Sequence, residues 1–164
     1  MSTIIRAATS ADVPLILTFI RHLAQFENLS DQVEATEARL LTTLFPEKAT
    51  PHAECVLAFA GEQPAGFAIF FTNYSTFLAA PGIHLEDLFV EPTLRRQGIG
   101  QALLRHLGAL AAARGCLRIE WLVLDWNLPA LNFYRALGAQ PLREWHLCRI
   151  DGSALAALNQ EFTL

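Results

Sequence analysis

The sequence predicts an α+β (mixed α/β) domain, with helices packed on a central mixed, mostly antiparallel sheet. The 164 residues are 52% apolar and only 17% charged, which is too apolar for a disordered chain and enough for one buried core. The first half holds apolar runs of strand length with no helix between them, whereas the second half alternates strands with helices. At about 150 residues per domain, we expect a single domain over residues 1–164.

The elements of the first half follow from apolar spacing and from turn residues. Residues 4–7 are a short apolar strand, and Thr9 with Asp12 forms a capping-box pattern before a helix whose apolar positions run from 13 to 24. A second helix is expected to begin near Thr36 and to end at Pro46. Three antiparallel strands are expected, the first two as a hairpin, over residues 55–60, 65–71 and 83–90.

In the second half the apolar period changes to that of a helix. Residues 98–114 carry leucines at helical spacing, and Gly115 stands where a helix C-cap glycine is expected. A β-rich segment follows, and then a short helix with proline in its first turn and glycine at its end. These two elements and one last strand are predicted over residues 117–124, 129–137 and 145–150.

Charge and composition exclude several classes of partner. The net charge of −4 and the pI near 5.7 lack the basic footprint of a nucleic-acid-binding protein, whereas they suit a cationic small molecule. The longest uncharged stretch, 63–83, is interrupted by prolines and polar residues, so no membrane segment is expected. The N-terminus has no basic segment leading into an apolar run, so a cytoplasmic location is expected. Cys55, Cys116 and Cys148 lie far apart, which favours reduced thiols over disulfides.

The most informative motif joins a strand to a helix at residues 88–100, Leu-Phe-Val-Glu-Pro-Thr-Leu-Arg-Arg-Gln-Gly-Ile-Gly. Because Gly98 and Gly100 lack side chains, several main-chain N–H groups can converge on an anion at the positive end of the helix, as pyrophosphate binding requires. Arg95 and Arg96 can add charge-assisted contacts. The segment is neither a Gly-x-Gly-x-x-Gly nucleotide pattern nor a P-loop. A tight turn onto a helix explains the glycine pair alone equally well.

A second motif, at residues 125–139, reads Asp-Trp-Asn-Leu-Pro-Ala-Leu-Asn-Phe-Tyr-Arg-Ala-Leu-Gly-Ala. Arg-x-x-Gly-x-Gly after a strand, followed by Asn-x-x-Ala-x-x-Phe-Tyr and a Gly-Ala exit, resembles the GNAT superfamily of acetyl-CoA-dependent N-acetyltransferases. The segments at 84–90 (His-Leu-Glu-Asp-Leu-Phe-Val), 126–129 (Trp-Asn-x-Pro) and 23–27 (Leu-Ala-x-Phe-Glu) are similar to its spermidine/spermine branch. That branch includes diamine and thialysine acetyltransferases, and the resemblance spans residues 5–151.

The resemblance implies a GNAT-like fold, with helices on both faces of a sheet that splays at the cofactor site. It implies acetyl-CoA as co-substrate and a homodimer as the assembly. In the family, the splayed strand holds the pantetheine arm and the thioester, and a following loop holds the pyrophosphate. The matching cofactor-binding residues here are Leu88, Phe89, Val90, Arg95, Arg96, Gln97, Gly98, Ile99, Gly100, Gln101, Asn127, Pro129, Ala130 and Arg135.

The resemblance also implies catalytic and substrate-binding residues. Tyr134 matches the general acid, and a phenol with a pKa of about 10 can protonate a departing thiolate. Glu86 matches the carboxylate that takes the amine proton, through water. Tyr134 as a core residue and Glu86 as a solvated strand carboxylate are the structural alternatives. Four residues are expected to contact or attract the cationic substrate: Glu27, Asp87, Glu120 and Trp145. Polyamine enzymes have no carboxylate at the position of Glu120, and Trp145 is equally well explained as a core residue.

The sequence therefore predicts an acetyl-CoA-dependent N-acetyltransferase that acts on a primary amine of a small cationic substrate. A diamine, a polyamine or a thialysine-like amino acid would attack acetyl-CoA directly in a ternary complex. The alternatives are a protein N-terminal or lysine acetyltransferase and a non-catalytic acyl-CoA-binding module. No metal is expected, because His84 and Glu86 have no third ligand near them in the sequence.

Overall fold

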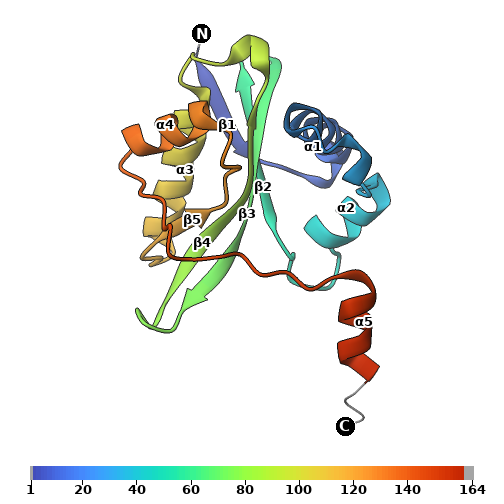
Figure 1. Cartoon of the computed structure of the whole chain (residues 1–164). Coiled ribbons are helices and arrows are strands. Elements are labelled where there is room, and N and C mark those ends of the chain that lie inside the picture. Colours follow the sequence, from blue (N-terminus) through green and yellow to red (C-terminus); the bar gives the residue numbers. More distant parts are fainter. Residues whose placement is uncertain (1, 161–164) are drawn as a thin grey trace. The chain divides into compact units, whose positions relative to one another are not determined.

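The computed structural model of the chain describes residues 2–160, and its contacts divide the chain into two compact units, residues 1–122 and 123–164. Each unit has its own set of helices and loops, and the sheet belongs to the first (Figure 1). A single acetyltransferase domain over residues 1–164 stays a prediction.

The first unit is built on a five-stranded sheet whose strands lie in sequence order (Figure 1). The first four strands are antiparallel to their neighbours, and the fifth runs parallel to the fourth. The predicted α+β class with a mixed, mostly antiparallel sheet is confirmed. The strands are β1 (Thr3–Ala7), β2 (Glu54–Ala60), β3 (Gln63–Ser75), β4 (Ala80–Val90) and β5 (Ile119–Trp121).

Local capping signals place the helices of this unit. Thr9 and Asp12 form the predicted capping box at the start of the first one, and the Thr36 side chain accepts a hydrogen bond from the amide of Arg39 at 3.2 Å. The helical segments are η1 (Ser10–Asp12), α1 (Val13–Glu27), η2 (Ser30–Gln32), α2 (Glu37–Leu44), η3 (Pro92–Leu94) and α3 (Ile99–Ala113).

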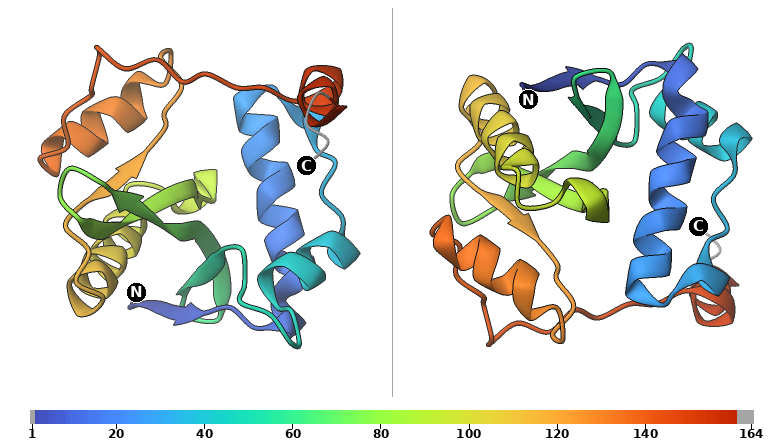
Figure 2. Two further views of the ribbon diagram at one scale, coloured as in Figure 1. Left: turned by 90° about the horizontal axis from the view of Figure 1, so that it is seen from below. Right: turned by 90° about the horizontal axis from the view of Figure 1, so that it is seen from above.

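Helices cover both faces of the sheet, as predicted. Figure 2 shows α1 and α3 on opposite sides of the strands. On one face, Leu103 and Leu107 of α3 pack against Leu85 of β4. On the other face, Phe19 of α1 stacks on Phe67 of β3, with ring centroids 5.5 Å apart. Successive strand residues point to opposite faces, so one run of apolar residues supplies both cores.

Some element boundaries differ from the prediction. The hairpin turn between β2 and β3 is only two residues long, because Pro64 pairs with Phe59 inside the ladder. The segment predicted as a strand over residues 117–124 contributes only three residues to the sheet. No helix within residues 2–160 has the length and the apolar character that a membrane crossing requires.

The second unit contains α4 (Leu128–Ala136) and α5 (Gly152–Gln160). The predicted helix over 129–137 is confirmed, and the predicted strand over 145–150 is wrong: these residues are irregular and exposed. An extended segment becomes a strand only when a neighbour completes its hydrogen bonds, and residues 123–160 include no other strand. The helix α5 was not predicted, although its alanines and leucines favour a helix.

Candidate active site

The edge of β4 is the first feature of the site. β4 pairs with β5 at only three positions, residues 83–85, yet it continues to Val90. Its register with β3 shifts between Ile69 and Phe70, which leaves Glu86 as the extra residue of a β-bulge.

Beyond this bulge, alternate residues of β4 turn to the free edge. The amide of Glu91 donates to the carbonyl of Ala65 at 2.9 Å, toward β3. Main-chain groups alternate along an antiparallel pair, so those of Leu88 and Val90 face away from β3. Within residues 2–122, no strand lies beside β4 at these positions. This edge can therefore form β-type hydrogen bonds with an extended ligand.

Arg95 ties this edge to the end of α1. Its Nε donates to the Val90 carbonyl at 3.0 Å, and its guanidinium lies 4.4 Å from the centre of the Phe26 ring. Desolvation lowers the pKa of Arg95, while the charge of Glu91 opposes this change. The side chain predicted to contact pyrophosphate thus also holds the loop and α1 in place.

The loop before α3 has the geometry of an anion-binding turn. Arg96 has φ +62° and the N-cap residue Gly98 has φ +83°, so consecutive amides turn toward the start of the helix. The first-turn amides of α3 have no intrahelical partner. A Cβ built at Gly98 would meet no atom within 4 Å, so the space in front of these amides is open. The predicted pyrophosphate group fits this loop in shape and charge.

Three carboxylates gather at the bulge of β4, and we call Glu27, Glu86 and Asp87 the acid trio. Burial raises the pKa of Asp87 to about 6, and the negative charges of Glu86 and Glu27 add to this rise. Burial also raises the pKa of Glu27. Where carboxylates disfavour one another's ionisation, a bound cation offsets the repulsion between them and stabilises their charged forms. The acid trio therefore has the electrostatics of an ammonium site.

His84 and Glu86 lie side by side on β4. His84 Nε2 is 3.7 Å from Glu86 Oε2, and the Glu86 side chain is 58% exposed, so water can reach it. The imidazole stacks on Phe71 of β3 with ring centroids 4.9 Å apart. Within the described chain, no group of three or more His, Cys, Asp or Glu residues could hold a metal ion.

Two residues that the sequence did not predict as part of the site, Asn73 and Arg118, bind the side chain of Glu120. Its Oε1 accepts a hydrogen bond from Asn73 Nδ2 and lies 3.2 Å from Arg118 Nη2. The available sequence signal was the spacing of two between Arg118 and Glu120, which places both on one face of a strand. Asn73 lies far away in the sequence and becomes a neighbour only through the strand register.

The remaining predicted residues belong to the second unit. The Asn127 side chain caps α4 by accepting a hydrogen bond from the amide of Ala130 at 3.2 Å, and Pro129 lies in the first turn. Tyr134 is on the same helix, with its ring centroid 5.2 Å from that of Phe133. The same helix also carries Arg135.

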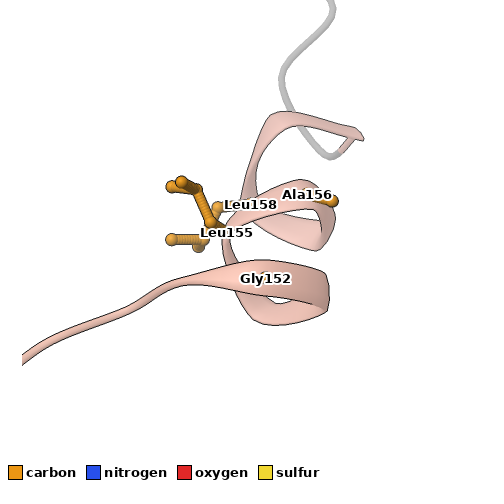
Figure 3. Close-up of a pocket in the computed structure, with 4 residues that line it drawn as sticks. All are labelled: Gly152, Leu155, Ala156 and Leu158. Atoms are coloured by element: carbon orange, nitrogen blue, oxygen red, sulfur yellow. The ribbon is translucent and has the colours of Figure 1, made fainter. Parts of the chain in front are cut away.

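Trp145 lies outside α4, on the irregular segment, and is 71% exposed, so the alternative of a core tryptophan finds no support. A shallow hollow on α5, lined by Gly152, Leu155, Ala156 and Leu158, has no charged side chain (Figure 3). It holds none of the predicted site residues.

All three cysteines are free thiols, and Cys55 is the buried one. Burial is the main cause that raises the pKa of Cys55 to about 12. The thiol therefore stays protonated and is a core residue, not a nucleophile.

Comparison with protein families gives a match to the acetyltransferase (GNAT) family over residues 18–139. The chain is 34% identical to an L-ornithine N5-acetyltransferase of Arabidopsis thaliana, across 95% of this chain and 87% of the relative. It is 38% identical to the thialysine N-epsilon-acetyltransferase of Bos taurus, across 94% and 95% of the two chains.

Among solved structures, an integron cassette protein from the mobile metagenome of V. cholerae superposes with a TM-score of 0.78. It is 25% identical and covers 98% of this chain and 99% of its own. An aminoglycoside acetyltransferase from an uncultured soil metagenomic sample superposes with a TM-score of 0.72 at 18% identity, over 92% and 95% of the two chains.

Proposed function

Because this chain belongs to the acetyltransferase (GNAT) family, we propose that it transfers the acetyl group of acetyl-CoA to a primary amine of a small cationic substrate. It is an enzyme of the GNAT acyltransferase type, and its thialysine and ornithine acetyltransferase relatives support N-acetylation of an amine. The observation that carries the proposal is the acid trio at the bulge of β4, in which the pKa values of Asp87 and Glu27 are raised, as fits a site for a cationic ligand.

Acetyl-CoA would be held by main-chain groups of the first unit. The open amides at Gly98 and along the first turn of α3, which includes Gly100 and Gln101, would bind the pyrophosphate. The main-chain groups of Leu88 and the amide of Val90 would bind the pantetheine arm, while buried Phe89 anchors the strand in the core. In the second unit, Asn127, Pro129, Ala130 and Arg135 are the proposed contacts.

The amine must lose a proton before it attacks, because an alkyl ammonium has a pKa of about 10.4. Glu86 is the proposed base, since it is exposed enough to take the proton through water. Glu27 and Asp87 would attract the cation. Trp145 would contact its alkyl-ammonium group by cation–π interaction.

The leaving thiolate must gain a proton, and Tyr134 is the proposed donor. A phenol can supply this proton as the C–S bond breaks and then recover it from water. Direct transfer between the two bound substrates needs no acetylated protein side chain.

We further propose a homodimer that resides in the cytoplasm. The second unit carries large exposed apolar side chains that an association between two copies would bury: Leu142, Leu147 and Ile150. The free thiols suit a reducing compartment.

The proposed base is tested by the pH profile of CoA thiol release for Glu86→Gln. If Glu86 takes the amine proton, the variant loses kcat/KM most at neutral pH and recovers as the pH approaches the amine pKa. Glu62→Gln, which changes an exposed carboxylate on the β2–β3 turn, is the matched control. Parallel profiles that differ only in the KM for the amine would make Glu86 a charge contact and exclude it as the base.

A further inference from the structure

A second polar cluster lies on the same sheet face as His84 and Glu86. Asn73 pairs with Gly82 across β3 and β4, and His84 pairs with Glu120 across β4 and β5. Arg118 precedes β5 and reaches Glu120 at 3.2 Å, while Asn73 donates to the same carboxylate oxygen. The cluster thus joins an amide, a guanidinium and a carboxylate across three strands.

Gly82 makes this cluster possible. A Cβ at this position would lie 2.6 Å from Asn73 Oδ1 and 2.9 Å from Arg118 Cγ, closer than real Cβ atoms come to their neighbours. Any other residue would push both side chains away. Glycine weakens the interior of a strand, and its usual reason there is close approach by another group.

The cluster does not satisfy its own hydrogen bonds. Asn73 Oδ1 and Arg118 Nε are buried, and neither has a hydrogen-bond partner among the described residues. A purely structural network normally closes, so one spare acceptor beside one spare donor requires an explanation. The outer ends of Arg118 and Glu120 are open to solvent, with 36% and 39% of each side chain exposed. A ligand that carries both a negative and a positive group matches the exposed ends of Arg118 and Glu120.

The spacing between the cluster and the acid trio fits one chemical class. Glu120 lies opposite His84 on the neighbouring strand, about 5 Å away, and Glu86 is two residues further along β4, about 7 Å at the rise of a strand, so the Cα atoms of Glu120 and Glu86 are about 8–9 Å apart. In an extended basic amino acid, four or five bonds of about 1.5 Å separate the α-carbon from the side-chain amine, a span of about 5–6 Å. With a hydrogen-bond contact of about 3 Å at its end, such a ligand covers this spacing, so a head group at Glu120 places the terminal amine beside Glu86.

From this geometry we propose that Asn73, Arg118 and Glu120 form a head-group site for an α-amino acid whose side-chain amine accepts the acetyl group. The inference rests on the proposed function. The exposed end of Arg118 binds the α-carboxylate and the exposed end of Glu120 binds the α-ammonium, while Asn73 holds Glu120 in position through its amide donor. A diamine of the same length carries no carboxylate, so it leaves Arg118 unused and is the poorer substrate.

The test compares each amino acid with its decarboxylated partner, L-lysine with cadaverine and L-ornithine with putrescine, by CoA thiol release at saturating acetyl-CoA. We expect the amino acid to have a kcat/KM about 10–100-fold above that of its diamine, the range that one hydrogen-bonded charge contact provides. Arg118→Gln lowers this ratio by about tenfold or more, and Glu120→Gln, which keeps the side-chain shape, lowers it too. Arg39→Gln, an exposed arginine of α2 that pairs with Glu34, leaves the ratio unchanged.

Each outcome has a distinct meaning. Equal kcat/KM for amino acids and diamines in the unmodified protein, or equal losses for both in a folded Arg118→Gln variant, would overturn the head-group site while the proposed function stands. Acetylation of neither class would refute the proposed function itself. Thermal unfolding of each variant shows whether it is folded, and the unmodified protein tests the preference even where a variant fails to fold.

Discussion

The ionised carboxylate of Asp87 destabilises the folded protein, so substitution of Asp87 should raise the free energy of unfolding. Its pKa rises from 3.8 to about 6 on folding, first through burial and then through Glu86 and Glu27. A raised pKa means that the folded protein binds this proton more tightly than the unfolded chain does. The free energy of unfolding therefore falls as the pH rises from about 4 to about 6, and this contribution is constant at higher pH.

The size of this cost follows from the shift. A rise of about two pKa units, at about 1.4 kcal/mol each, gives an upper bound of about 3 kcal/mol above pH 6. Asp87→Asn removes the charge but keeps a buried polar group, so we expect a gain of about 1–3 kcal/mol in the free energy of unfolding at pH 7.5. Near pH 4, where the parent carboxyl is mostly protonated, the gain should largely disappear. The same variant should raise the KM for the amine, because the acid trio loses one charge.

Urea unfolding of Asp87→Asn at pH 7.5 and pH 4 measures both numbers. Asp31→Asn, an exposed aspartate of η2, is the control and should change stability little at either pH. A variant that is less stable than the parent at pH 7.5, or equally stabilised at both pH values, would show that burial and neighbouring charges do not make the ionised Asp87 destabilising.

Three further substitutions and one control substitution have defined outcomes. Gly98→Val should raise the dissociation constant of acetyl-CoA in calorimetry, because the side chain enters the open space before the amides and opposes φ +83°; unchanged affinity in folded protein would remove the loop from the site. Tyr134→Phe should lower kcat by about 10²-fold or more with little change in either KM; a parental rate would make the hydroxyl structural. Gly66→Ala should lower the free energy of unfolding by about 2 kcal/mol or more, because its Cβ would overlap sterically with the Phe89 carbonyl oxygen. In the same thermal melts, Gly108→Ala in α3, where a Cβ meets no atom within 4 Å, should not destabilise.

Local chemistry in the sequence predicted the features that depend on few neighbours. The capping box at Thr9 and Asp12 and the glycine at the end of the helix, Gly115, depend on hydrogen bonds and dihedral angles within a few residues, and the structure contains both.

Features that depend on strand register could not be predicted in the same way. The bulge that separates Glu86 from Asp87 appears only when β4 is paired with β3. The meeting of Asn73, Gly82 and Arg118 depends on three strands that are distant in the sequence. The prediction of a strand over residues 145–150 was wrong because this strand-like segment has no partner strand within its unit.

The central claim is acetyl transfer from acetyl-CoA to a small cationic amine, and CoA thiol release with one acceptor at a time tests it most directly. The acceptors are L-lysine, L-ornithine, putrescine, spermidine and a peptide with a free N-terminus. We predict release with small cationic amines, a large loss of that release in Glu86→Gln at neutral pH, and little release with the peptide. Release with the peptide alone, or no release from protein that still binds CoA in calorimetry, would contradict the claim.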